Sequence, residues 1–387
     1  MTEAIVEKIA AAYERDQARA GKKASIDELP LSYEALTAEW LTHALCRSVP
    51  GAVVDKFELG PVDDGSSNRR KIKITYNSKG QSAGLPAALF CKASHDLVNR
   101  WVLSISGAAL SEATFYRSVR DLLDIEAPRA YFAEVDEESF NSLIILGDIS
   151  DSVAEFCDHE TVVSRSRAES QMKLLATMHG SVYGSPELQK RIQKFITWPE
   201  NLQKTLGFGM REGSNQGFLD AESVIPARLY RRYNEIWPLT LVSAALHENV
   251  PHTLQHGDVH LKNWYVASND QMGLSDWQCA GRGIWARDVA YTMASSLQPD
   301  DRRAWERDLL KEYLELMHEA GGPKVSFDDG WLAYRQQLIT ALTWWTVTLS
   351  PPGTMPDMQP RDTALEFIRR ISIAMDDLDT LDALMSG

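Results

Sequence analysis

Residues 255–264, with the sequence QHGDVHLKNW, combine two histidines, an aspartate, a lysine and an asparagine in one turn-prone stretch. One chemistry that fits is zinc binding, because His252, His256 and His260 recur at every fourth position and would share one face of a helix. A proline and a glycine in this segment disfavour a helix, and the H-E-x-x-H pattern of zinc proteases does not follow. A zinc hydrolase is therefore a minor alternative.

A second chemistry comes from two short apolar runs, WYVA at 264–267 and MGLSD at 272–276, separated by SNDQ. A four-residue connection of this kind is typical of a β-hairpin. In the register that it predicts, Asn263 lies opposite Asp276, with Cβ atoms about 5 Å apart. An amide oxygen and a carboxylate are hard ligands that suit Mg²⁺. The hairpin therefore predicts a divalent-metal site on Asn263 and Asp276.

Asp258 lies five residues before Asn263, so a loop can hold its carboxylate beside the metal without making it a ligand. A carboxylate next to Mg²⁺-bound phosphates can orient a hydroxyl group and accept its proton as the bond to phosphorus forms. The combination predicts a phosphotransfer loop with Asp258 as the catalytic residue.

The order HGDVHLKN followed by LSDW resembles the H-x-D-x-x-x-x-N and metal-aspartate motifs of protein-kinase-like small-molecule kinases, namely the aminoglycoside phosphotransferase and choline kinase group. The resemblance implies that His256 positions the catalytic loop and that Asp288, within GRGIWARDVAY, supports it. The segments LTAEWL and FCKA…SEATFY are similar to the ecdysteroid-kinase-like branch of this group.

The part of the chain before residue 150 alternates β-like runs with turns, then a helical pattern at 106–123, then two more β-like runs. This pattern predicts a small antiparallel sheet with one long helix. Lys92 ends a strand and Glu112 lies on the next helix. The kinase group has this order, in which the lysine holds the donor phosphates and the glutamate pairs with it.

The turn DDGSSNRR between the first two strands would, by resemblance, be the phosphate loop. Gly65, Ser66 and Ser67 would then offer backbone N–H groups and hydroxyls to the phosphates. The turn departs from the G-x-G-x-x-G pattern, since it holds a single glycine.

Helical periodicity dominates the rest of the chain, apart from the hairpin. We therefore expect a helical extension at 1–50, a β-rich N-lobe at 51–147 that holds the nucleotide phosphates, and a helical C-lobe at 148–387 with the catalytic loop, metal hairpin and acceptor site. This is the α+β class, with the two-lobed protein-kinase-like fold that the resemblance implies.

The formal net charge of −14 argues against a surface that neutralises nucleic-acid phosphates. Residues 1–24 carry charges throughout and lack the apolar core of a signal peptide. The longest uncharged stretch, 336–356, contains three prolines and is a poor match to a membrane helix. We therefore expect a cytoplasmic protein without nucleic-acid or membrane partners, and the sequence indicates no particular oligomeric state.

The resemblance implies a kinase that uses ATP, or GTP, and Mg²⁺ to phosphorylate a small-molecule alcohol. The uncharged stretch 336–356 carries Trp344 and Trp345. If this stretch lines the acceptor pocket, its aromatic rings favour a partly apolar acceptor. An aminoglycoside or choline-like amine is the alternative. A further alternative is a pseudokinase that binds nucleotide without transfer. The occupied catalytic positions argue against this alternative.

Overall fold

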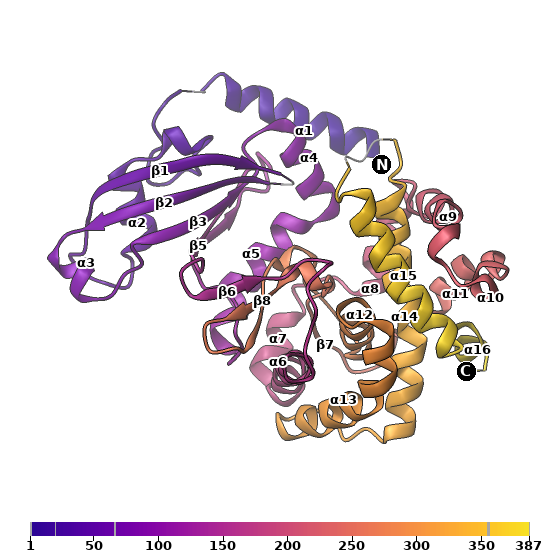
Figure 1. The fold of residues 1–387 in the computed structure, drawn as a ribbon. Helices are drawn as coiled ribbons and strands as arrows, with labels where there is room; N and C mark the ends of the chain where they lie inside the picture. The colour runs from indigo at the N-terminus through magenta and orange to yellow at the C-terminus, as the bar shows by residue number, and fades with distance from the viewer. Residues whose placement is uncertain (1, 20, 66, 354–356, 387) are drawn as a thin grey trace. The chain divides into compact units, whose positions relative to one another are not determined.

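The computed structural model describes residues 2–19, 21–65, 67–353 and 357–386 (Figure 1). The chain forms two compact units: residues 1–121 with 128–151, and residues 122–127 with 152–387. The predicted α+β class is confirmed, because the first unit contains an antiparallel sheet and the second is mostly helical. In the described part of the chain, every helix is too short or too polar to span a bilayer.

The sheet of the first unit has the strand order β1-β2-β3-β5-β4, with antiparallel neighbours throughout. Side chains of β2 alternate as a half-buried strand requires: Ile72 and Ile74 face the core, whereas Lys71 and Lys73 are exposed. Trp40 from α2 (Ala38–Leu45) packs into the same core. The strands are β1 (Val54–Asp64), β2 (Asn68–Tyr76), β3 (Ala88–Ala93), β4 (Ala130–Val135) and β5 (Ser142–Gly147).

The helix predicted at 106–123 is present as the shorter helix α5, and a further helix, α4, precedes it. Gly107 between α4 and α5 has a φ of 80°. A left-handed glycine at this position ends a helix, because it turns the chain away from the helical path. The helices of this unit are α1 (Thr2–Gln17), α2 (Ala38–Leu45), α3 (Ser78–Ser82), α4 (Leu97–Ser106) and α5 (Ala108–Ser118).

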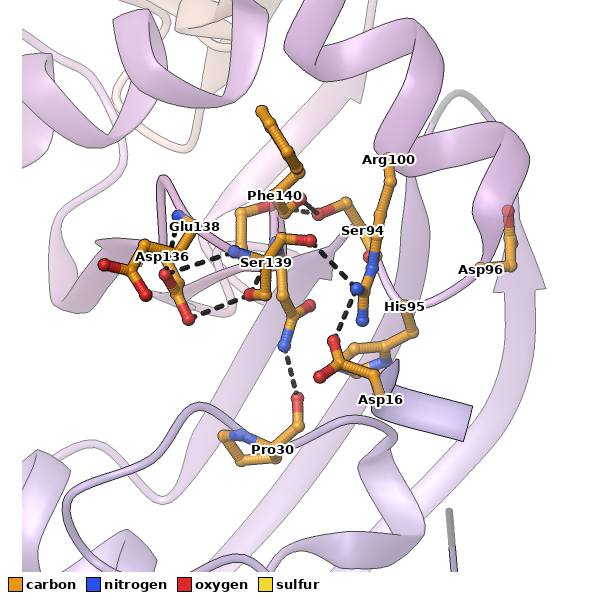
Figure 2. Close-up of polar contacts among 12 residues, drawn as sticks. Asp16, Pro30, Ser94, His95, Asp96, Arg100, Asp136, Glu138, Ser139 and Phe140 are labelled. Atoms are coloured by element: carbon orange, nitrogen blue, oxygen red, sulfur yellow. Dashed lines mark hydrogen bonds and ion pairs between the residues drawn. The ribbon is translucent and has the colours of Figure 1, made fainter. Parts of the chain in front are cut away.

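The amino-terminal helix α1 packs against α4 within the first unit (Figure 1). Arg100 of α4 is fully buried, and its guanidinium lies 2.5 Å from the Asp16 carboxylate. It also donates to the backbone carbonyls of Ser94, at 3.1 Å, and Ser139, at 2.9 Å (Figure 2). Arg100 therefore fastens α1 to the turn after β3 and to the β4–β5 connection.

The second unit is built around α14, which contacts α9, α11, α12 and α15. Gly217 of α9 permits one of these contacts, because a Cβ there would lie 1.9 Å from the Thr346 carbonyl oxygen. The helices are α6 (Arg165–Gly184), α7 (Pro186–Ile192), α8 (Trp198–Leu206), α9 (Met210–Asp220), α10 (Ala227–Tyr230), α11 (Tyr233–Ala245), α12 (Ala286–Ser296), α13 (Pro299–Glu319), α14 (Phe327–Leu349), α15 (Arg361–Asp377) and α16 (Thr380–Met385).

The predicted hairpin is present, but its predicted register is wrong by one residue. Trp264 lies opposite Leu274, so the strands end with Asn263 beside Ser275 and not beside Asp276. The cause is a three-residue loop in which Asp270 adopts a φ of 62°. The strands of this unit are β6 (Val153–Phe156), β7 (Thr253–Gln255), β8 (Trp264–Ala267), β9 (Met272–Leu274) and β10 (Gly281–Gly283), paired as β6-β8-β9 and β10-β7.

Candidate active site

The structure places the predicted site residues in two groups. The second unit holds the catalytic loop, the hairpin end and the residue predicted to support the loop: His256, Asp258, Asn263, Asp276 and Asp288. The first unit holds the predicted donor-phosphate residues Gly65, Ser67, Lys92 and Glu112. Ser66, which is also part of that prediction, lies outside the described residues.

The predicted catalytic loop begins after β7 and is held in place by α12. The Asp288 carboxylate accepts hydrogen bonds from the backbone N–H groups of His256, at 2.7 Å, and Gly257, at 3.1 Å. Gly257 has a φ of 84°, and a Cβ there would lie 2.3 Å from the Cys279 carbonyl oxygen. The loop therefore follows a path that requires both a buried acceptor and a glycine.

Asp288 is itself fully buried. Burial raises the pKa of its carboxyl, but His179, followed by Arg287 and His256, outweighs this effect and holds the pKa below its ordinary value. The His179 Nε2 atom lies 3.5 Å from Asp288 Oδ2, and its Nδ1 atom lies 2.6 Å from the Tyr313 hydroxyl. His179 looks like an ordinary core residue in the sequence, yet it packs directly behind the loop support.

The His256 ring lies inside the loop. Its Nδ1 atom accepts a hydrogen bond from the Asp258 backbone N–H at 3.2 Å, and its Nε2 atom lies 2.9 Å from the Ser275 carbonyl oxygen. Burial lowers the pKa of His256. A neutral imidazole that accepts through Nδ1 carries its proton on Nε2 and can donate to Ser275. His256 thus joins the catalytic loop to the hairpin.

The Asp258 carboxylate is held by three side chains. Its Oδ1 atom accepts a hydrogen bond from the Tyr291 hydroxyl at 3.1 Å, and its Oδ2 atom lies 3.4 Å from both Asn263 Nδ2 and His260 Nε2. Burial raises the pKa of Asp258, but the nearby His260, with His256 and Tyr291, outweighs it and holds the pKa well below its usual range. The side chain is still 32% exposed, so an ionised acceptor of protons is accessible.

Asn263 lies at the end of the hairpin, and its Nδ2 atom donates to the Asp258 carbonyl oxygen at 2.7 Å. An amide that donates in this direction keeps Oδ1 as an acceptor for a cation. Asp276 is offset by one position from the expected pairing and adopts a left-handed backbone with a φ of 60°. Strain at a non-glycine residue is a common feature of functional sites. The Asn263 amide oxygen and the Asp276 carboxylate are oxygen donors of the type that fits Mg²⁺.

The zinc alternative gains no support. His252 Nε2 contacts the His247 carbonyl oxygen at 2.6 Å, while His256 and His260 make the separate contacts described above. Among the described residues, no three His, Cys, Asp or Glu side chains gather in an arrangement suited to a metal.

In the first unit, the Lys92 ammonium on β3 lies 2.8 Å from the Glu112 carboxylate on α5. Gly65 donates its backbone N–H to the Ser67 carbonyl oxygen at 3.0 Å in the turn between β1 and β2, and Ser67 is buried. Asn68, to which the sequence pattern assigns no role, anchors this turn. Its Oδ1 atom accepts from the His95 backbone N–H, and its Nδ2 atom donates to Asp96, both at 2.8 Å.

Residues 156–325 match the family model of the phosphotransferase enzyme family. This segment contains the catalytic loop, the hairpin and Asp288, so the predicted resemblance to the aminoglycoside phosphotransferase and choline kinase group is confirmed. The ecdysteroid-kinase-like branch stays a prediction. No curated protein sequence matches the chain.

Several solved structures are similar to the chain at low sequence identity. Choline kinase LicA from Streptococcus pneumoniae is 14% identical, with 86% of this chain and 94% of that chain covered and a TM-score of 0.45. Choline kinase from Cryptosporidium parvum is 11% identical, with 84% and 89% covered and a TM-score of 0.48. The GDP complex of an aminoglycoside 2'-phosphotransferase-IIIa mutant is 11% identical, with 91% and 99% covered and a TM-score of 0.46.

Proposed function

We propose that this protein is a small-molecule kinase, which transfers the γ-phosphate of ATP or GTP to a hydroxyl group of a small acceptor. The observation that carries the proposal is the Asp258 carboxylate, which is partly exposed and 3.4 Å from the Asn263 amide, with a pKa held well below its usual range by His260, His256 and Tyr291. The match of residues 156–325 to a phosphotransferase family supports the same reaction class.

In the proposed reaction, Asp258 accepts the proton of the acceptor hydroxyl as its oxygen bonds to the γ-phosphorus. The bond between the γ-phosphorus and the β–γ bridging oxygen breaks, so the nucleoside diphosphate leaves. Lys92 would hold the donor phosphates, and Glu112 would position Lys92. Asn263 and Asp276 would hold Mg²⁺, which neutralises phosphate charge when bound.

For the acceptor we propose a hydroxylated, partly apolar small molecule. The uncharged part of α14 reaches the catalytic loop, because the Trp345 ring lies 5.2 Å from the His260 ring, edge to face. Trp345 is buried and Trp344 packs against Trp198, so the indole faces belong to the core. Apolar contact with an acceptor would therefore come from residues further along α14.

A pocket of about 480 Å³ lies at the carboxyl end of α14, which is a normal size for a small-molecule site. Lys262 of the catalytic loop contacts its wall, since its Nζ atom lies 2.7 Å from Gln359 Oε1. The lining mixes polar and apolar side chains: Thr348, Leu349, Asp357, Met358, Gln359, Pro360 and Arg361. Asp357 favours the amine-type alternative, because a carboxylate in the pocket lining would attract a cationic amine.

The test is phosphorylation of three acceptor panels, namely apolar alcohols, choline-like amines and aminoglycosides, each with ATP and with GTP. Product is detected by phosphorus NMR or mass spectrometry. We expect a phosphate ester of an apolar alcohol. Turnover of an aminoglycoside or an amine alone would correct the acceptor and keep the kinase, whereas bound nucleotide without transfer to any acceptor would favour the pseudokinase.

A further inference from the structure

Tyr291 makes the shortest side-chain contact to the Asp258 carboxylate among the described residues. Its hydroxyl donates to Oδ1 at 3.1 Å, whereas the nearest side-chain contacts of Oδ2 are 3.4 Å long. Tyr291 is 1% exposed and lies on α12, one turn after Asp288. The sequence gives it no role.

The two residues of α12 act on the same loop in different ways. Asp288 accepts from the loop backbone at His256 and Gly257, and Tyr291 donates to the Asp258 side chain. Residues three apart share one face of a helix, so one rigid element sets both the path of the loop and the rotation of its carboxylate.

We propose that Tyr291 is a positioning residue for phosphoryl transfer. It holds Asp258 Oδ1 at 3.1 Å, and Oδ2, whose contacts to Asn263 and His260 are longer at 3.4 Å, accepts the proton of the acceptor. This inference rests on the proposed function, since it assigns Asp258 as the residue that orients the acceptor. A carboxylate held at one oxygen keeps the other oxygen in a fixed direction, as a reaction with a defined attack geometry requires.

The chemistry of the Tyr291 hydroxyl suits a permanent donor. Burial, followed by the neighbouring Asp258 carboxylate, raises the pKa of Tyr291 well above its ordinary value. The hydroxyl therefore stays protonated at neutral pH. It can fix the carboxylate but does not compete with it for the proton of the acceptor.

The chain offers a closely matched control in Tyr334 of α14. Tyr334 is also fully buried, and its hydroxyl donates to the buried Glu306 carboxylate at 2.9 Å. Tyr291→Phe and Tyr334→Phe therefore each remove one buried hydrogen bond between a tyrosine and a carboxylate in the same unit. They differ in whether that carboxylate belongs to the catalytic loop.

The experiment uses the full chain with Mg·ATP and water as the acceptor, so that no acceptor needs to be known. Hydrolysis is followed under single-turnover conditions, nucleotide affinity by calorimetry, and folding by near-UV circular dichroism. We expect Tyr291→Phe to slow hydrolysis by at least about tenfold while nucleotide affinity stays within about twofold. Tyr334→Phe should keep the wild-type rate within about twofold.

A second comparison remains informative if Tyr291→Phe is less stable than the wild type. In an Asp258→Asn background, Tyr291→Phe should slow hydrolysis no further, because its effect passes through Asp258. An equal loss in both backgrounds would overturn the proposal, as would equal rates for Tyr291→Phe and Tyr334→Phe. If Asp258→Asn alone hydrolyses ATP at the wild-type rate, the proposed function itself fails. That outcome differs from the two results that would overturn the role of Tyr291.

Discussion

The Lys92 ammonium and the Glu112 carboxylate lie 2.8 Å apart, with side chains only 9% and 3% exposed. A buried pair of this kind does not by itself stabilise a fold strongly, because the cost of removing both charges from water offsets their attraction. The pair therefore holds the ammonium group of Lys92 at a defined place on β3.

Lys92→Ala should weaken use of the nucleotide donor, because the proposed contact with the donor phosphates is lost. Glu112→Ala should give a milder defect of the same kind, because Glu112 only positions the lysine. Steady-state kinetics with varied donor and saturating acceptor measures both effects. A Glu112 variant far worse than the Lys92 variant, at equal folded fraction, would contradict this order of roles.

Asn263→Ala and Asp276→Ala should each remove Mg²⁺-dependent nucleotide binding, because both residues would bind the same ion. The double variant should lose little more than the worse single variant, since groups that share one partner are not additive. Mg²⁺ titrations of nucleotide affinity measure this. Asn269→Ala, in the exposed loop of the same hairpin, is the matched control and should behave as wild type.

Asp288→Asn should lower the free energy of unfolding by about 1 to 3 kcal/mol, because an amide cannot satisfy two backbone donors as a carboxylate does. Asp308→Asn provides the control, since its side chain is 74% exposed. Urea denaturation at neutral pH compares the two. Equal stability of both variants would mean that Asp288 does not support the loop.

The lowered pKa of Asp288 predicts that the free energy of unfolding depends on pH. Its pKa is lower in the folded chain than the ordinary value of about 4 for an unfolded aspartate. Its contribution to stability is thus complete above that value and is lost as the pH falls through the folded pKa. Unfolding free energies measured from neutral pH down to acid should fall less steeply in Asp288→Asn than in the wild type.

Much of this architecture could be predicted from local patterns. The α+β class follows from alternating runs before residue 150 and helical periodicity after it, and the hairpin follows from two apolar runs around a polar loop. The register could not be predicted, because SNDQ reads as a four-residue loop. Asp270 in a left-handed conformation closes a three-residue loop instead, and one residue of difference moves Asp276 out of alignment with Asn263.

Contacts over a long sequence separation left no local signal. Tyr291 reaches Asp258 from 33 residues away, and its place in a fully buried helix makes it look like ordinary core. His179 is similar, because only the folded chain brings it next to Asp288. A turn asparagine such as Asn68 is common in any protein, so its bonds to the residues after β3 could not be inferred from its type.

The rate of phosphoryl transfer by Asp258→Asn shows directly whether Asp258 accepts the proton of the acceptor hydroxyl. The substitution keeps the shape of the side chain and removes its capacity to accept a proton. Single-turnover transfer from ATP and nucleotide affinity are measured in parallel, with wild type as the reference. We expect a rate lower by about 10² to 10⁴ with nearly unchanged nucleotide affinity. A near-normal rate in a folded variant would contradict the assignment of Asp258 and, with it, the proposed mechanism.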